Sequence, residues 1–169
     1  MTESTTATMP NVAAIQEELV QTQAAFQSLL ISISPGEWRR KGRGSAWSVG
    51  EMIAHLTWSV EQLPREIMAA RRGKGMFNMP GWLRDPLSFA YTRWLSRGYT
   101  PHSAGQRYMA AIVAVGALIK TVGNDEWQRG ARFYGERFYT VEDLCHTPAQ
   151  HLAEHRSTID QILGRSART

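Results

Sequence analysis

Four long stretches of this 169-residue sequence repeat apolar residues at helical spacing, and they constrain the fold more than any other feature. They run from about residue 12 to 33, 48 to 73, 100 to 123 and 140 to 164. In each, apolar side chains recur three, four or seven residues apart, which places them on one face of a helix. Such helices bury their apolar faces against one another, so the pattern predicts an all-α four-helix bundle.

The boundaries of these helices carry recognisable start and stop signals. Ser48 and Glu51 form an S-x-x-E capping box, and Thr140 with Asp143 forms a weaker one. In such a box each side chain satisfies a backbone N–H that has no partner inside the helix. Glycines, which favour helix ends, follow three of the stretches: Gly73, Gly123 and Gly164.

The connection from 73 to 100 is long and rich in methionine and aromatic residues. Asp85-Pro86 reads as an N-cap followed by a first-turn proline, so we expect a short helix from there to Gly98. Residues 133–139 are the one candidate for a hairpin. Some apolar side chains of the connection either line a substrate cleft or serve as core or dimer contacts: Met76, Phe77, Met79, Trp82 and Trp94.

The chemistry-bearing feature is a set of three histidines. His151 and His155 stand four residues apart, so they share one face of a helix. By helical phase both face the bundle interior, while His55 lies on the flank of another predicted helix. Three imidazoles at one point suit a divalent ion, whose nitrogen ligands lie about 2 Å away. We therefore hypothesise one metal site; the alternative is three hydrogen-bonded core histidines.

This metal hypothesis predicts a topology. His55 lies about 10 Å from the start of its helix, and His155 about 13 Å from the end of its own. The two match in height only if these helices run antiparallel. An up-down-up-down bundle would make them parallel. The long 73–100 connection permits the up-down-down-up alternative, which the metal site requires.

Two further motifs have weaker interpretations. Residues 151–155 fit the H-x-x-E-H pattern of inverted zinc proteases, but those sites need a downstream acidic ligand, and only Asp160 is available. Glu154 also projects away from the apolar stripe. Cys145 lies too far along the helix to share an ion with His151, so we expect a packed thiol. No general base is identifiable; Glu51 and Tyr108 are only guesses.

Composition excludes several classes of protein. An apolar content of 43% supports one domain over residues 10–165, with a Thr/Ser-rich, disordered tail at 1–9. The net charge of +4 comes from scattered arginines without a nucleic-acid-binding motif, so we expect no nucleic-acid partner. The sequence has no membrane-length apolar run, no secretory signal and one cysteine. A cytoplasmic location and no membrane partner are the expectation.

The residues W-S-V-G-E-M-I-A-H-L at 47–56 and A-Q-H-L-A-E-H-R-S-T-I-D-Q-I at 149–162 resemble the DinB/YfiT-like superfamily. The resemblance covers nearly the whole chain. It implies a four-helix bundle of up-down-down-up topology. It also implies that three histidines bind nickel or zinc, and these fall on His55, His151 and His155. Arg156 stands where many relatives have a further histidine.

Characterised relatives include transferases and isomerases that use low-molecular-weight bacterial thiols. The resemblance therefore implies a thiol-dependent S-transferase or related detoxification enzyme acting on a small molecule. A metal-bound thiol loses its proton and becomes a nucleophile, and a bound water would give a hydrolase instead. A non-catalytic bundle that binds a ligand or partner is the third alternative. The family also makes a homodimer an expectation.

Overall fold

A computed structural model describes residues 10–134 and 137–165 of the chain. The described part contains five helices: α1 (Val12–Ser32), α2 (Val49–Arg71), α3 (Gly81–Ser96), α4 (Pro101–Ile119) and α5 (Val141–Leu163). Two short strands, β1 (Gly130–Phe133) and β2 (Arg137–Thr140), pair antiparallel. The tail expected at 1–9 lies outside the described residues. None of the described helices combines the length and hydropathy needed to cross a bilayer.

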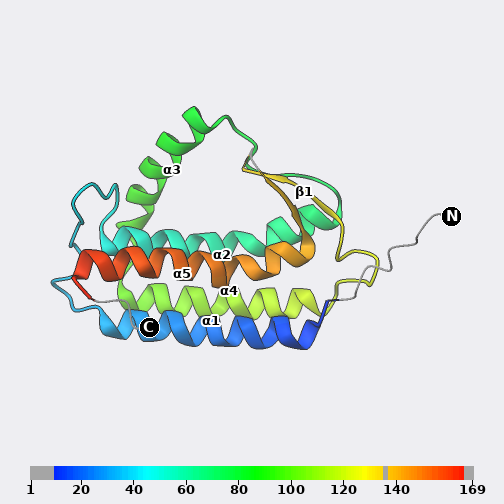
Figure 1. Ribbon diagram of the computed structural model, residues 1–169, viewed down its shortest axis with the longest axis horizontal. Coiled ribbons are helices and arrows are strands. Elements are labelled where there is room, and N and C mark those ends of the chain that lie inside the picture. The colour runs from blue at the N-terminus through cyan, green and yellow to red at the C-terminus, as the bar shows by residue number, and fades with distance from the viewer. Residues whose placement is uncertain (1–9, 135–136, 166–169) are drawn as a thin grey trace.

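Four of the helices, α1, α2, α4 and α5, form the predicted bundle (Figure 1). The colours of Figure 1 show that α2 and α4 run in the same direction, whereas α1 and α5 run in the opposite one. The up-down-down-up topology is therefore confirmed. Because α2 and α4 are parallel, the chain must return along the bundle between them, and α3 lies on this return path above the bundle.

Local hydrogen bonds explain where the bundle helices begin. Both predicted capping boxes are present: the hydroxyls of Ser48 and Thr140 accept from the backbone N–H groups of Glu51 and Asp143, whose carboxylates accept in return. At its C-terminal end α5 closes on Gly164, whose φ of 67° is a left-handed conformation that favours glycine.

The prediction that Asp85 caps the short helix was wrong. The helix α3 begins five residues earlier, at Gly81, because the carbonyl of Pro80 accepts the first hydrogen bonds, from Leu83 and Arg84. The Asp85 carboxylate instead accepts a hydrogen bond from the Arg84 guanidinium at 2.9 Å. Proline therefore stands inside α3, at position 86.

Two other predicted boundaries shifted. The helix α4 ends at Ile119 rather than near Gly123, because the backbone N–H groups of Thr121 and Val122 bond three residues back and tighten the chain into turns. The predicted hairpin is present and longer than expected, since its pairing extends to Gly130 and Thr140.

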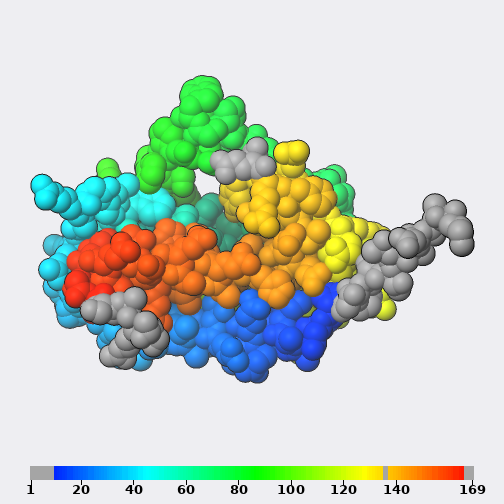
Figure 2. Space-filling view, viewed as in Figure 1, coloured from blue at the N-terminus to red at the C-terminus, as the bar shows by residue number. Residues whose placement is uncertain are grey.

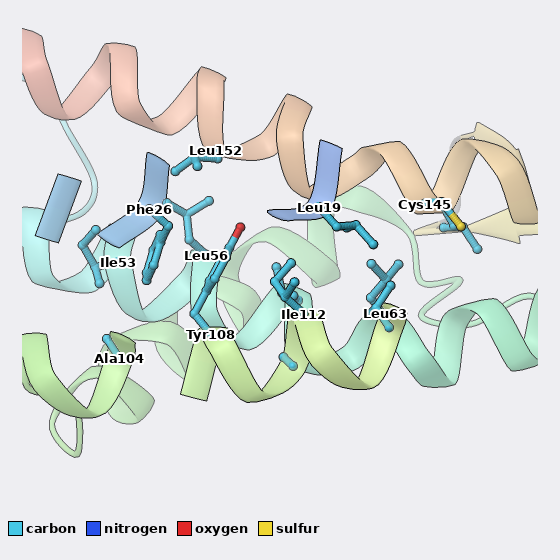
Figure 3. Close-up of a cluster of buried hydrophobic side chains, with 14 of the residues drawn as sticks. Leu19, Phe26, Ile53, Leu56, Leu63, Ala104, Tyr108, Ile112, Cys145 and Leu152 are labelled. Carbon is cyan, nitrogen blue, oxygen red and sulfur yellow. The ribbon is translucent and has the colours of Figure 1, made fainter. Parts of the chain in front are cut away.

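The core lies where the four bundle helices face one another (Figure 3). Phe26 of α1 stacks on Tyr108 of α4 with ring centroids 3.8 Å apart. Cys145 is a packed thiol, as expected: it is buried, and burial raises its pKa to about 12. Tyr108 is likewise fully buried, and its hydroxyl has no hydrogen-bond partner among the described residues.

Candidate metal centre

The antiparallel pairing of α2 and α5 brings the three predicted histidines together. His55 comes from α2, and His151 and His155 come from successive turns of α5. The Nε2 atom of His151 lies 3.2 Å from that of His55 and 3.0 Å from that of His155. All three potential ligand atoms lie within 4.8 Å of one another. We refer to these residues as the histidine cluster.

Hydrogen bonding determines which His151 nitrogen is available. The Ser59 hydroxyl donates to the Leu56 carbonyl at 2.8 Å, so its oxygen is left to accept. It lies 3.2 Å from Nδ1 of His151, which therefore carries the proton. The lone pair of His151 is consequently on Nε2, the atom that faces the other two histidines. A serine in this position also fixes the orientation of the ring.

The donor set of the histidine cluster fits a divalent metal ion. One lone pair on His151 Nε2 can accept only one hydrogen bond, yet two imidazole nitrogens approach it closely. At least one close N···N approach therefore lacks a hydrogen, and a shared cation would satisfy all three atoms. Nitrogens bound about 2.0–2.1 Å from one ion lie roughly 2.9–3.4 Å apart, which matches both measured separations.

The three imidazoles are neutral near pH 7, the form that binds metals. Burial, followed by the positive charges that His151 and His155 would carry, lowers the pKa of His55 to about 3. Burial and the neighbouring His155 lower the pKa of His151 to about 4. The pKa of His155 is lowered by burial and is raised slightly by Glu154.

Trp47 covers one side of the histidine cluster. Its ring centroid lies 4.6 Å from that of His55 and 6.1 Å from that of His155. Phe89 of α3 packs edge-on against the same indole at 5.2 Å. Within the described part of the chain, His55 Nδ1 and Trp47 Nε1 are buried without a hydrogen-bond partner. This side of the cluster is therefore apolar, whereas the opposite side opens into a cleft.

The cleft has a volume of about 1010 Å³ and lies between the bundle and the segments above it. Residues of α2 and α5, including His55 and His151, form its floor, while α3, residues 76–79 and the hairpin form its walls. Figure 2 shows the hollow between the green α3 segment and the gold hairpin, with teal α2 at the bottom. A small molecule in the cleft would reach the histidine cluster.

Of the two alternatives for the apolar side chains of the 73–100 connection, a cleft lining holds for part of the set. Met76, Phe77 and Met79 line the cleft. Trp82 and Trp94 do not; their exposed fractions are 78% and 63%, and they lie neither in the core nor among the lining residues.

The guessed general bases are occupied elsewhere. Glu51 accepts in its capping box and faces Arg93 at 3.4 Å. Tyr108 is stacked in the core. Neither residue is among those that line the cleft.

Sequence reasoning missed four residues of the site: Trp47, Ser59, Glu66 and Tyr134. A signal existed for two of them. Ser59 follows His55 by one helical turn and Glu66 follows it by three, so both share its face of α2. Trp47 and Tyr134 belong to connecting segments without periodicity, where spacing carries no such information.

Comparison with known proteins supports this description of the fold. The chain resembles the crystal structure of the mycothiol-dependent maleylpyruvate isomerase, with a TM-score of 0.65 at 14% sequence identity. The match covers 89% of this chain and 61% of that one, so the chain spans about three fifths of the length of the similar structure. No curated protein matches the sequence. The family model of the DinB superfamily matches residues 18–159, and the chain therefore belongs to the DinB superfamily.

Proposed function

We propose that this protein is a divalent-metal enzyme of the thiol-dependent S-transferase type, with His55, His151 and His155 as the ligands of nickel or zinc. The observation that carries the proposal is the convergence of the three imidazoles at the floor of an open cleft. Two neighbouring Nε2 pairs lie 3.0–3.2 Å apart, a spacing that has no complete hydrogen-bonding explanation. One bound ion accounts for both approaches.

Each part of the site has a role in this proposal. A bound divalent ion would lower the pKa of a thiol in the cleft and so favour its thiolate, the nucleophilic form. Ser59 holds the His151 ring in the tautomer that presents Nε2. Trp47 excludes water from the side of His55 that faces away from the cleft. The cleft holds the small-molecule electrophile beside the histidine cluster.

The thiol enters the proposal through the family and the similar fold. A mycothiol-dependent isomerase shares this architecture, which makes a low-molecular-weight thiol a reasonable cosubstrate here. One observation favours a hydrolase as the second candidate. Glu154 borders the cleft next to His155, where a carboxylate could accept a proton from water. A non-catalytic binding bundle is the outcome expected if no metal binds.

Elemental analysis of tag-free protein tests the metal site. Wild type should contain nearly one nickel or zinc ion per chain, and His155→Ala should contain almost none. The matched control is His102→Ala, because His102 is exposed on α4 and should not affect metal content. Wild type that stays metal-free after incubation with both ions, with an intact helical spectrum, would contradict the proposal.

Turnover assays then separate the two reactions. Metal-loaded protein is supplied with a chromogenic aryl halide and mycothiol, bacillithiol or cysteine, and separately with a nitrophenyl ester without thiol. An S-transferase should consume the halide only when thiol is present. Ester cleavage that needs metal but no thiol would support the hydrolase instead.

A further inference from the structure

The end of the cleft far from the histidine cluster contains a buried acid that the proposed function does not use. Glu66 of α2 is only 4% exposed, yet it lines the cleft. Among the described residues its carboxylate accepts one hydrogen bond, from the Tyr134 hydroxyl, and makes no ion pair. Burial raises its pKa, and the Tyr134 hydrogen bond offsets only part of that effect.

Three aromatic rings line the cleft with this acid, and the nearest of them, Tyr134, reaches its carboxylate through the phenol hydroxyl. The Tyr134 ring stacks on that of Phe77, with centroids 5.6 Å apart and planes within 9°. Trp58 approaches Phe77 edge-on at 6.1 Å. All three rings line the cleft. Proteins use aromatic rings that line a pocket to bind ammonium groups, because the negative ring faces attract a cation.

The backbone supports a binding role for these rings. Phe77 and Tyr134 have φ values of 57° and 58°, and they are the positive-φ residues other than glycine in the described chain. For bulky side chains this conformation is costly, on the order of 1 kcal/mol or more for each residue. A hydrogen bond of 3.2 Å from the Tyr134 N–H to the Met76 carbonyl holds the two segments together. Such strain is concentrated at ligand-binding sites.

The described residues that line the cleft carry a net charge opposite in sign to that of the whole chain. The chain carries a formal net charge of +4. The described lining includes three carboxylates and two guanidiniums: Glu66, Asp85, Glu154, Arg65 and Arg84. Arg84 is already paired with Asp85 at 2.9 Å, and Arg65 is exposed and points to Gln62. Neither arginine forms an ion pair with Glu66.

We propose that the Glu66 end of the cleft binds an ammonium group, with Glu66 as its counter-ion and with Tyr134 and Phe77 as its aromatic walls. A cation here would compensate a buried carboxylate that otherwise lacks a charged partner. This part of the proposal stands on the cleft alone and does not require a metal.

The position of Glu66 predicts how far the ammonium group of the ligand lies from its reacting atom, an inference that rests on the proposed function. Glu66 follows His55 by eleven residues on α2. Eleven residues are three turns plus about 20°, so the two side chains leave the same helix face about 16 Å apart. The molecule that reacts at the histidine cluster therefore carries its ammonium group about 16 Å from the reacting atom.

A pair of isosteric probes tests the ammonium pocket. Choline and 3,3-dimethylbutan-1-ol have the same shape and differ in charge, and isothermal titration calorimetry measures both. Wild type should bind choline at least tenfold more tightly than the neutral alcohol. Glu66→Gln should reduce this ratio to within about twofold. An amide oxygen still accepts from Tyr134, so this variant should keep its fold, which circular dichroism checks.

Further variants test which residues cause the preference for choline. Glu154→Gln removes another carboxylate of the same cleft and should retain the preference for choline. Phe77→Leu should weaken choline binding more than alcohol binding, and it keeps the test decisive if Glu66→Gln does not fold. The preference for choline should persist in His155→Ala. This result would support the ammonium pocket independently of the metal proposal. Equal binding of both probes, no binding of choline, or an unchanged ratio in Glu66→Gln would overturn the proposal.

Discussion

The two sides of α2 differ in what their side chains require from their surroundings. One side carries Ile53 and Leu63, which pack in the bundle core and need only an apolar surface of matching shape. The other side carries His55, Ser59 and Glu66, each of which contains polar atoms that require partners. His55 Nδ1 has none among the described residues, and Glu66 has only Tyr134. A single helix therefore contributes both to the core of the bundle and to the polar surface of the cleft.

The largest effect should come from the core side. Phe26→Ala removes a fully buried ring that stacks on Tyr108. Loss of the ring and the cavity it leaves should cost about 3–5 kcal/mol, so thermal unfolding should occur at least about 6 °C lower. The folded fraction should still bind metal. Ile31→Ala is the matched control on α1, because Ile31 is 85% exposed and should change stability by less than about 0.5 kcal/mol.

On the cleft side, Ser59→Ala should weaken metal binding and leave the stability of the fold nearly unchanged. Without the hydroxyl, His151 loses the acceptor that fixes its tautomer, so metal affinity should fall about 10- to 100-fold while stability hardly changes. Competition with a chelator measures the affinity. Ser96→Ala is the control, since Ser96 makes a similar bond to a carbonyl three residues back but contacts no histidine. Equal affinities for wild type and Ser59→Ala would contradict the proposal that Ser59 fixes the tautomer of His151.

A buried acid on the cleft side should also make stability depend on pH. The folded-state pKa of Glu66 lies above its ordinary value of 4.5 because of burial. Between these two pKa values the folded chain keeps a proton that the unfolded chain has released. The free energy of unfolding therefore falls as pH rises through this window and stays lower above it.

The variant Glu66→Gln cannot titrate at this position, so its free energy of unfolding should not show this decrease with rising pH. Relative to wild type its melting temperature should rise from pH 4.5 to pH 8, by an amount on the order of 2–4 °C if about 1 kcal/mol is recovered. Thermal unfolding of both proteins across this range measures the difference. A difference that stays constant or shrinks with increasing pH would show that Glu66 has an ordinary pKa.

The smallest effect should come from Trp82→Ala. Trp82 is large and aromatic, but it lies outside both the core and the cleft and is 78% exposed. The substitution should change stability by less than about 0.5 kcal/mol and leave choline and metal binding unaltered. Calorimetry and elemental analysis check both points. A clear loss of ligand binding would place α3 closer to the bound ligand than the cleft residues indicate.

Much of the bundle could be predicted from the sequence because apolar periodicity reports burial directly. The same helical phase brought His151 and His155 to one face, and the heights of His55 and His155 required an antiparallel pair. The topology followed, and it is confirmed. That these three residues bind a metal remains a proposal; what the sequence anticipated correctly is their meeting at one point.

The walls of the cleft could not be predicted in the same way. Phe77 and Tyr134 meet through left-handed backbone conformations in two segments about 57 residues apart, and no spacing rule anticipates such a contact. The start of α3 was missed for a related reason. An Asp-Pro pair is a common N-terminal signal, but a competing carbonyl at Pro80 and a competing cation at Arg84 decided the outcome.

The parallel arrangement of α2 and α4 has a consequence for how such a protein can acquire new specificity. The bundle needs a return segment of its own length, and in this chain that segment holds α3 and residues 76–79, which form much of the cleft wall. None of the three histidines belongs to it. Exchange of the return segment between relatives is therefore expected to change which molecules the cleft accepts and to leave the three histidines in place.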